Sequence, residues 1–284
     1  MRGQALTELI FAHALMAGLG VALGLGAARL LRDRESRAAR ALPPIALLLL
    51  IAGLRLRDSL IFGPLVAAWP SALPLTDPTL PLTGLTLGSV WHRLPESRLR
   101  RVALSGSLAL VALALILLPM LEPAPPGSPA TQGRLCTQSD PSSCSAAAAA
   151  TLLREHGLTM SERTMIPLCL TRRSGTTSLG VVRGLALATR GTPWRVEAGL
   201  RDTAGYDRIP CPALLTMRLP RFGDVDPRYE RDWGWTRGTG HSVVLLDYRG
   251  DRVLMADPAT GIEEWHVESI RVLWNGDLIR LVER

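Results

Sequence analysis

Apolar positions dominate the first part of the chain, in stretches of very different length. The stretch 5–31 is long enough to cross a bilayer, and 102–121 contains twenty residues without a charge. Between them, 42–54 is apolar but short, and 59–91 is interrupted by prolines, which leaves a second span, a broken helix and a re-entrant segment open. We therefore expect residues 1–121 to form a transmembrane region of several helices.

The pattern changes after this region. Residues 122–134 are rich in proline and predict a semi-stiff linker. In the part 135–284, helical patterns come first and strand-like alternation follows, which predicts an α+β domain with N-terminal helices packed on an antiparallel sheet. The expected helices begin near residues 144, 161 and 178, and the expected strands are 194–198, 213–219, 241–248, 251–257 and 277–282.

The charged residues predict a membrane topology and argue against two functions. The chain has a net charge of +7, and all 32 basic residues are arginine. Without lysine it has no phosphate-loop lysine of the Walker type, so we expect no transport ATPase within it. The arginines cluster beside apolar spans, where the positive-inside rule explains them without a nucleic acid partner. Arginines at 29–40 and 93–101 predict cytoplasmic loops, which puts the C-terminal domain on the extracytoplasmic face.

The first candidate for chemistry is Cys144. The run 138–150 joins turn-forming residues to five alanines, so the cysteine falls at the start of a helix. A helix N-terminus lowers the pKa of a thiol and produces a nucleophile. The side-chain amide of Gln138 and the backbone N–H of Cys144 could together form an oxyanion hole. The alternative is a buried, inert cysteine with a surface glutamine before it.

A second candidate group lies about a hundred residues later. The sequence predicts two strands that fold back about Arg249 and Gly250. This hairpin brings His241 and Asp257 together at its open end, where the carboxylate can orient the imidazole. The alternative is a surface histidine at a strand start and an aspartate that opens a turn.

Together these residues resemble the bacteriocin-processing cysteine peptidases, the papain-like domains that remove double-glycine leaders. The resemblance covers 135–284 and rests on the Gln138 and Cys144 spacing, on His-x-Val-Val-Leu from His241, and on the Asp-Pro pair at Asp257. It implies that Cys144 is the nucleophile, His241 the base, Asp257 the orienting residue and Gln138 the oxyanion donor. The sequence differs from the family at Ser143 and Ser145, where an acidic residue and a glycine are usual.

The remaining polar features are less specific. Cys136, Cys169 and Cys211 could form one disulfide in an oxidising compartment or stay reduced in the cytoplasm. Their spacing matches no common metal motif, so we expect no metal and no cofactor. The polar loop 220–240 contains Trp233 and Trp235. These rings could line a substrate groove, pack on the core or contact the bilayer.

The sequence therefore predicts a membrane-anchored cysteine endopeptidase with a peptide or protein substrate. Its expected location is the bacterial inner membrane, as a multi-pass protein whose peptidase domain is extracytoplasmic. The resemblance suggests leader processing of an exported peptide and a separate ABC transporter as partner, although related peptidases fused to transporters act in the cytoplasm. Two alternatives stay open: a catalytically weak module that binds leader peptides for a transporter, and a papain-like acyltransferase or cell-wall peptide hydrolase.

Overall fold

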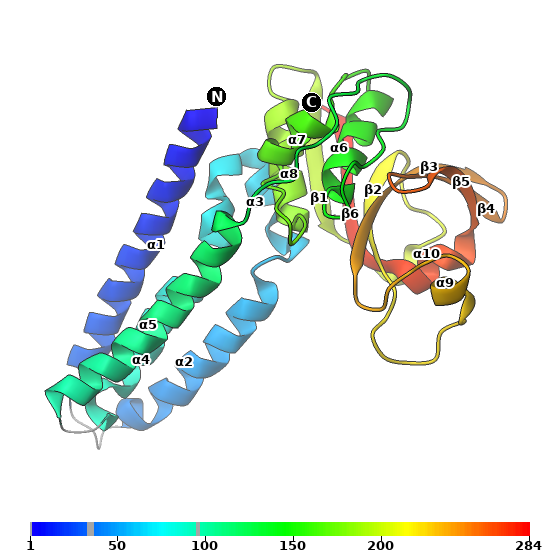
Figure 1. The fold of residues 1–284 in the computed structure, drawn as a ribbon. Coiled ribbons are helices and arrows are strands. Elements are labelled where there is room, and N and C mark those ends of the chain that lie inside the picture. Colours follow the sequence, from blue (N-terminus) through cyan, green and yellow to red (C-terminus); the bar gives the residue numbers. More distant parts are fainter. Residues whose placement is uncertain (1, 33–36, 95–96) are drawn as a thin grey trace. The chain divides into compact units, whose positions relative to one another are not determined.

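The computed structural model of the protein describes residues 2–32, 37–94 and 97–284 (Figure 1). The protein forms two compact units, one of Met1–Ser59 with Ser71–Glu122 and one of Leu60–Pro70 with Pro123–Arg284. Leu60–Pro70 groups with the C-terminal unit, although the sequence on both sides of it belongs to the N-terminal one.

The N-terminal unit is helical. Its elements are α1 (Arg2–Leu30), α2 (Arg37–Leu56), η2 (Pro70–Thr76), α4 (Thr79–Val90), η3 (Trp91–Arg93) and α5 (Arg98–Leu121). Among the described residues, two stretches are long and apolar enough to cross a membrane, Leu9–Leu30 and Leu99–Ile116. The proline-rich stretch 59–91 consists of short helices.

Glycines allow α1 and α4 to pack closely. A Cβ atom at Gly20 would lie 2.6 Å from the carbonyl oxygen of Leu80, and one at Gly24 would lie 2.8 Å from that of Gly84. Small residues four apart are the usual way for apolar helices to bring their backbones together. Gly20 and Gly24 of α1 are thus part of a helix-packing surface.

The C-terminal unit is an α+β domain, which confirms the predicted class (Figure 1). Its main helices are α6 (Cys144–Glu155), α7 (Glu162–Leu168) and α8 (Ser178–Ala188), with the short η1 (Leu60–Phe62), α3 (Gly63–Ala68), η4 (Thr203–Gly205), α9 (Arg228–Arg231) and α10 (Val267–Leu273). Its strands are β1 (Trp194–Leu200), β2 (Ala213–Arg218), β3 (Gly240–Arg249), β4 (Arg252–Asp257), β5 (Gly261–His266) and β6 (Trp274–Glu283). Within the described residues they form one antiparallel sheet in the order β1-β6-β2-β3-β4-β5.

Small side chains seat α6 against the sheet. The five alanines Ala146–Ala150 are completely buried, and α6 contacts β3 more extensively than it contacts the other strands. An alanine face lets a helix approach a sheet closely, and the lost contact area is offset by the high helix propensity of alanine. This packing fixes the N-terminus of α6 beside β3.

Candidate active site

Cys144 is the first residue of α6. The residue is 8% exposed, and the Ser143 side chain before it is fully buried. Ser143 Oγ donates to the carbonyl oxygen of Asp140 over 2.7 Å instead of accepting from an N–H group of α6. The N–H groups of the first turn are thus left for another acceptor, and the positive end of the helix dipole favours an anion there.

His241 and Asp257 meet at the open end of the β3–β4 hairpin. Val244 pairs with Ala256, and the turn at Gly250 has a positive φ of 68°, which suits glycine. His241 Nε2 donates to Asp257 Oδ1 over 2.7 Å. Asp257 is 5% exposed and also accepts from the backbone N–H of Ala259 over 2.8 Å. Since Nε2 is engaged by Asp257, Nδ1 is the ring nitrogen left for the sulfur.

The electrostatics of Cys144 and His241 favour an ion pair. Burial raises the pKa of the Cys144 thiol, but the hydrogen bond and charge of His241, with hydrogen bonds from Ser242 and Ser145, lower it more. The net pKa lies below the usual 9.0. Burial lowers the pKa of His241, but hydrogen bonds to Asp257 and Cys144 and their charges raise it to about 10. The arrangement therefore stabilises a thiolate beside an imidazolium.

The other cysteines lack this environment. All four cysteines lie among the described residues and have free thiols. Burial raises the pKa of Cys136, raises that of Cys169 to about 12 and raises that of Cys211 to about 11. Cys144 is thus the cysteine whose thiol pKa is lowered and not raised. Across the described residues, the structure contains no group of three or more His, Cys, Asp or Glu side chains that could hold a metal ion.

Gln138 lies in the loop before α6. Its backbone N–H donates to the carbonyl oxygen of Pro258 over 2.9 Å, which joins this loop to the residue after Asp257. Its side-chain nitrogen Nε2 makes a long bond of 3.3 Å to the carbonyl oxygen of Asp140. Its Oε1 atom is buried and has no hydrogen-bond partner among the described residues. The amide is therefore weakly held.

Two residues near the site have roles that the sequence alone did not reveal. Ser145 Oγ lies 2.8 Å from Ser242 Oγ, so the helix that begins at Cys144 is bonded to the residue after His241. Glu162, at the start of α7, is fully buried and accepts from the backbone N–H groups of Ser128 (2.6 Å) and Ser139 (2.8 Å). In the sequence, Ser145 is only a serine after a cysteine and Glu162 only the residue after a cap, and neither position indicates these contacts.

The tryptophans of loop 220–240 take different positions. The Trp235 ring meets the His241 ring edge-on, with centroids 5.8 Å apart, and it also contacts the core. Trp233 is 52% exposed and packs against Tyr229. A pocket of about 480 Å³ extends from Trp235 and Asp257 towards Trp265. Trp235 therefore both packs on the core and borders a pocket beside His241.

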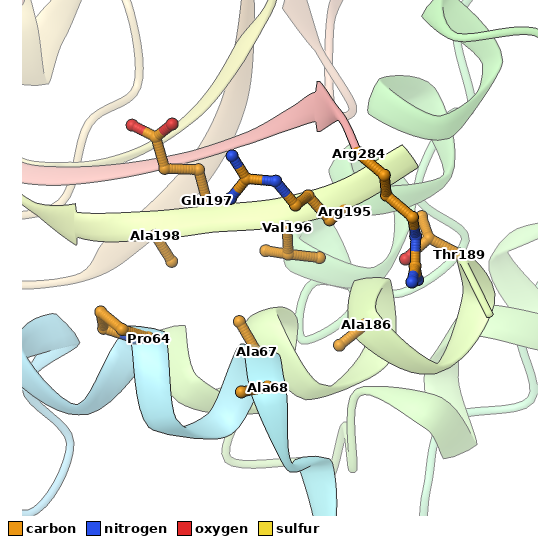
Figure 2. Close-up of a pocket in the computed structure, with 10 residues that line it drawn as sticks. All are labelled: Pro64, Ala67, Ala68, Ala186, Thr189, Arg195, Val196, Glu197, Ala198 and Arg284. Carbon is orange, nitrogen blue, oxygen red and sulfur yellow. The ribbon is translucent and has the colours of Figure 1, made fainter. Parts of the chain in front are cut away.

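A second cavity, of about 270 Å³, lies between β1, α3 and α8 (Figure 2). Ala67, Ala186 and Val196 point into it, and Arg284 lies beside Thr189 at one end. A Cβ atom at Gly63 would lie 3.0 Å from the Cβ atom of Ala198, so α3 packs tightly on β1 next to this cavity. Small apolar side chains make up most of the lining, together with Thr189, Arg195, Glu197 and Arg284, and neither Cys144 nor His241 belongs to it.

Comparison with solved structures finds peptidase domains. The peptidase domain of Streptococcus ComA, a bi-functional ABC transporter involved in a quorum sensing pathway, is 19% identical over 53% of this chain and 98% of its own, with a TM-score of 0.42. A double glycine motif protease from an AMS/PCAT transporter, in complex with the leader peptide, is 17% identical over 58% of this chain and 99% of its own, with a TM-score of 0.40. The N-terminal peptidase C39 like domain of a toxin secretion ATP-binding protein from Vibrio parahaemolyticus is 14% identical over 51% of this chain and 98% of its own, with a TM-score of 0.33. No protein-family model matches the sequence, and no curated protein matches it.

These structures are of the class of peptidase domain that the sequence motifs resemble. The C-terminal unit has the α+β arrangement expected from the sequence, in which a helix that begins with cysteine packs on an antiparallel sheet. His241 and Asp257 lie on neighbouring strands of that sheet.

Proposed function

We propose that this protein is a membrane-anchored cysteine endopeptidase in which Cys144, His241, Asp257 and Gln138 carry the reaction. The observation that carries the proposal is the opposite shift of two pKa values at one place, lowered for the Cys144 thiol and raised for His241. Structural cysteines in cores show the reverse, as Cys169 does. Perturbed acid and base groups in contact are typical of catalytic sites.

The reaction follows from these groups. The Cys144 thiolate attacks the carbonyl carbon of the scissile peptide bond, and the resulting oxyanion accepts from the Cys144 N–H and from Gln138 Nε2. Nε2 can leave its long bond to the carbonyl oxygen of Asp140 at little cost. His241 then protonates the leaving amine, which breaks the C–N bond and leaves a thioester on Cys144. Water, deprotonated by His241, hydrolyses the thioester, and the sulfur leaves as a thiolate beside the imidazolium, which restores the starting pair.

Asp257 acts on the reaction through His241. Its 2.7 Å bond to Nε2 fixes the ring and stabilises the imidazolium. The edge of the Trp235 ring lies against the imidazole on the side of loop 220–240. This contact reduces the access of water to the bond between His241 and Asp257 and so keeps it strong.

The substrate that we propose is an exported peptide with a double-glycine leader, delivered by or to a separate ABC transporter. The motif resemblance around Cys144 and His241 supports this proposal. The two apolar helices that could span a membrane support an anchor in the bacterial inner membrane, and the arginine pattern supports an extracytoplasmic peptidase domain.

Ser143 and Ser145 are the residues that would argue for a non-catalytic leader-binding module. Ser143 holds the turn before α6 through Asp140, and Ser145 bonds Ser242 beside His241. Each serine therefore supports the geometry of the site, and we favour the peptidase over the binding module.

The test is cleavage by the full-length protein in detergent. Peptides with a Gly-Gly pair inside an octapeptide are incubated with the wild type and with Cys144→Ala, and the products are identified by mass spectrometry. We expect cleavage after the glycine pair that Cys144→Ala abolishes, while Cys211→Ala, a matched control at an exposed cysteine, retains it. Equal product from wild type and Cys144→Ala would contradict the proposal, and so would a product formed by acyl transfer without hydrolysis.

A further inference from the structure

The pocket beside Asp257 is lined by aromatic rings and carboxylates. The rings of Trp235 and Trp265 stand at 77° to each other, with centroids 6.1 Å apart. Carboxylate groups outnumber guanidinium groups in the lining within the described residues, with Asp232, Glu263, Glu264 and the His241-bonded Asp257 against Arg252. Two aromatic faces set nearly at right angles beside a negative charge form the kind of environment that attracts organic cations.

Glu263 provides the charge that lacks a cationic partner. Asp232 pairs with Arg231 and Glu264 with Arg249, whereas no cation among the described residues pairs with Glu263. Its Oε2 atom accepts from the neutral indole N–H of Trp265 over 2.8 Å.

Strand alternation shows which way Glu263 faces. Glu263 pairs with Met255 and Trp265 pairs with Val253, and both of these β4 residues are completely buried. Because cross-strand partners share a face of the sheet, Glu263 and Trp265 lie on the core-facing side of β5. The carboxylate and the indole are therefore directed to the same side, where the pocket lies, and are only half-buried.

The position of the pocket indicates which part of a substrate reaches it. His241 must deliver its proton to the amine that leaves, so the substrate residues after the scissile bond pass on the His241 side of Cys144. Trp235 contacts His241 and also lines the pocket, and Asp257 lies at the pocket wall. The pocket is thus on the leaving-group side of the site.

We propose that this pocket is a specificity subsite that binds the side chain of an arginine or lysine located after the scissile bond. The inference rests on the proposed peptidase function, because that function sets the direction of the substrate. The cation lies against the faces of Trp235 and Trp265, and its charge is balanced by Glu263.

The test measures binding to the full-length protein in detergent, in the Cys144→Ala background so that no turnover occurs. The probes are acetyl-Leu-Gly-Gly peptide amides with four following alanines, in which one of the first three alanines is replaced by arginine or by citrulline, its neutral isostere. The variant is Glu263→Gln, which keeps an oxygen acceptor for Trp265 Nε1. Glu283→Gln, at an exposed carboxylate outside the pocket, is the matched control.

We expect one arginine peptide to bind about 10-fold more tightly than its citrulline counterpart. Glu263→Gln should reduce this ratio to about twofold or less, and Glu283→Gln should leave it unchanged. Equal affinities for arginine and citrulline at all three positions would overturn the proposal, and so would a ratio that Glu263→Gln does not change or an absence of binding by every peptide.

Cleavage of the same peptides by the protein with Cys144 intact separates this inference from the proposed function. If the arginine and citrulline peptides bind equally and are cleaved equally, the proposed subsite is wrong and the proposed peptidase function stands. If an arginine peptide binds selectively but is not cleaved, the proposed peptidase function is wrong and the pocket is still a cation-binding site.

Discussion

Ser145 Oγ and Ser242 Oγ lie 2.8 Å apart, and this contact joins the residue after Cys144 to the residue after His241. Both serines are buried, at 6% and 4% exposure. The contact runs directly from α6 to β3. The relative position of sulfur and imidazole is therefore fixed by the helix, by the strand and by this hydrogen bond.

Ser145→Ala should destabilise the protein and weaken the thiolate. The change leaves the Ser242 hydroxyl buried without its partner, which costs about 1–2 kcal/mol. It also removes one of the hydrogen bonds that lower the pKa of Cys144. A double-mutant cycle with Ser242→Ala, measured by thermal unfolding in detergent, should give a coupling energy of about 1 kcal/mol. Strictly additive effects would show that the two hydroxyls do not interact.

Glu162→Gln should loosen the loop that precedes Cys144. The buried carboxylate accepts from the N–H groups of Ser128 and Ser139, and the amide would turn a donor towards one of them. We expect a loss of about 2–3 kcal/mol in the free energy of unfolding, because one buried N–H loses a charged acceptor. Glu155→Gln, which breaks a partly exposed ion pair with Arg134, is the control and should change stability by less than about 1 kcal/mol. An equal effect of the two changes would contradict the role of Glu162.

The pH dependence of kcat/KM should reflect the two shifted pKa values. Activity requires the thiolate of Cys144 and the imidazolium of His241, so it rises with pH through the lowered pKa of Cys144 and falls through the raised pKa of His241, near 10. Asp257→Asn keeps an acceptor for Nε2 but removes the negative charge. Its alkaline limb should therefore move from about 10 towards 6.5, with Asp251→Asn as the exposed control. An unchanged alkaline limb in Asp257→Asn would exclude Asp257 as the cause of the shift.

The sequence allowed the hairpin of His241 and Asp257 to be predicted because local signals define it. A short continuous run of apolar residues marks each strand, and Gly250 at the turn has the positive φ that glycine favours. The start of α6 at Cys144 was predictable for the same reason, since turn residues precede a run of alanines. Both features are encoded within a few neighbouring residues.

Contacts between distant segments could not be predicted in this way. Glu162 reads as a first-turn helix residue, and its bonds to Ser128 and Ser139 depend on how the linker crosses α7. Ser145 reads as a departure from a family pattern, and its partner lies ninety-seven residues later. β5 alternates between exposed and half-buried residues at the sheet edge, and its sequence contains charged and aromatic residues without a clear apolar period. Such features become visible only when the sheet order is known.

Alkylation measures directly whether His241 holds Cys144 as a thiolate. The rate of iodoacetamide modification of Cys144 is followed as a function of pH in the full-length protein, in the wild type and in His241→Ala. We expect a wild-type midpoint below 9.0 and an upward shift of at least about one pH unit in His241→Ala, because burial then acts without the opposing charge. Modification with the same midpoint in both proteins, at or above 9.0, would contradict the account.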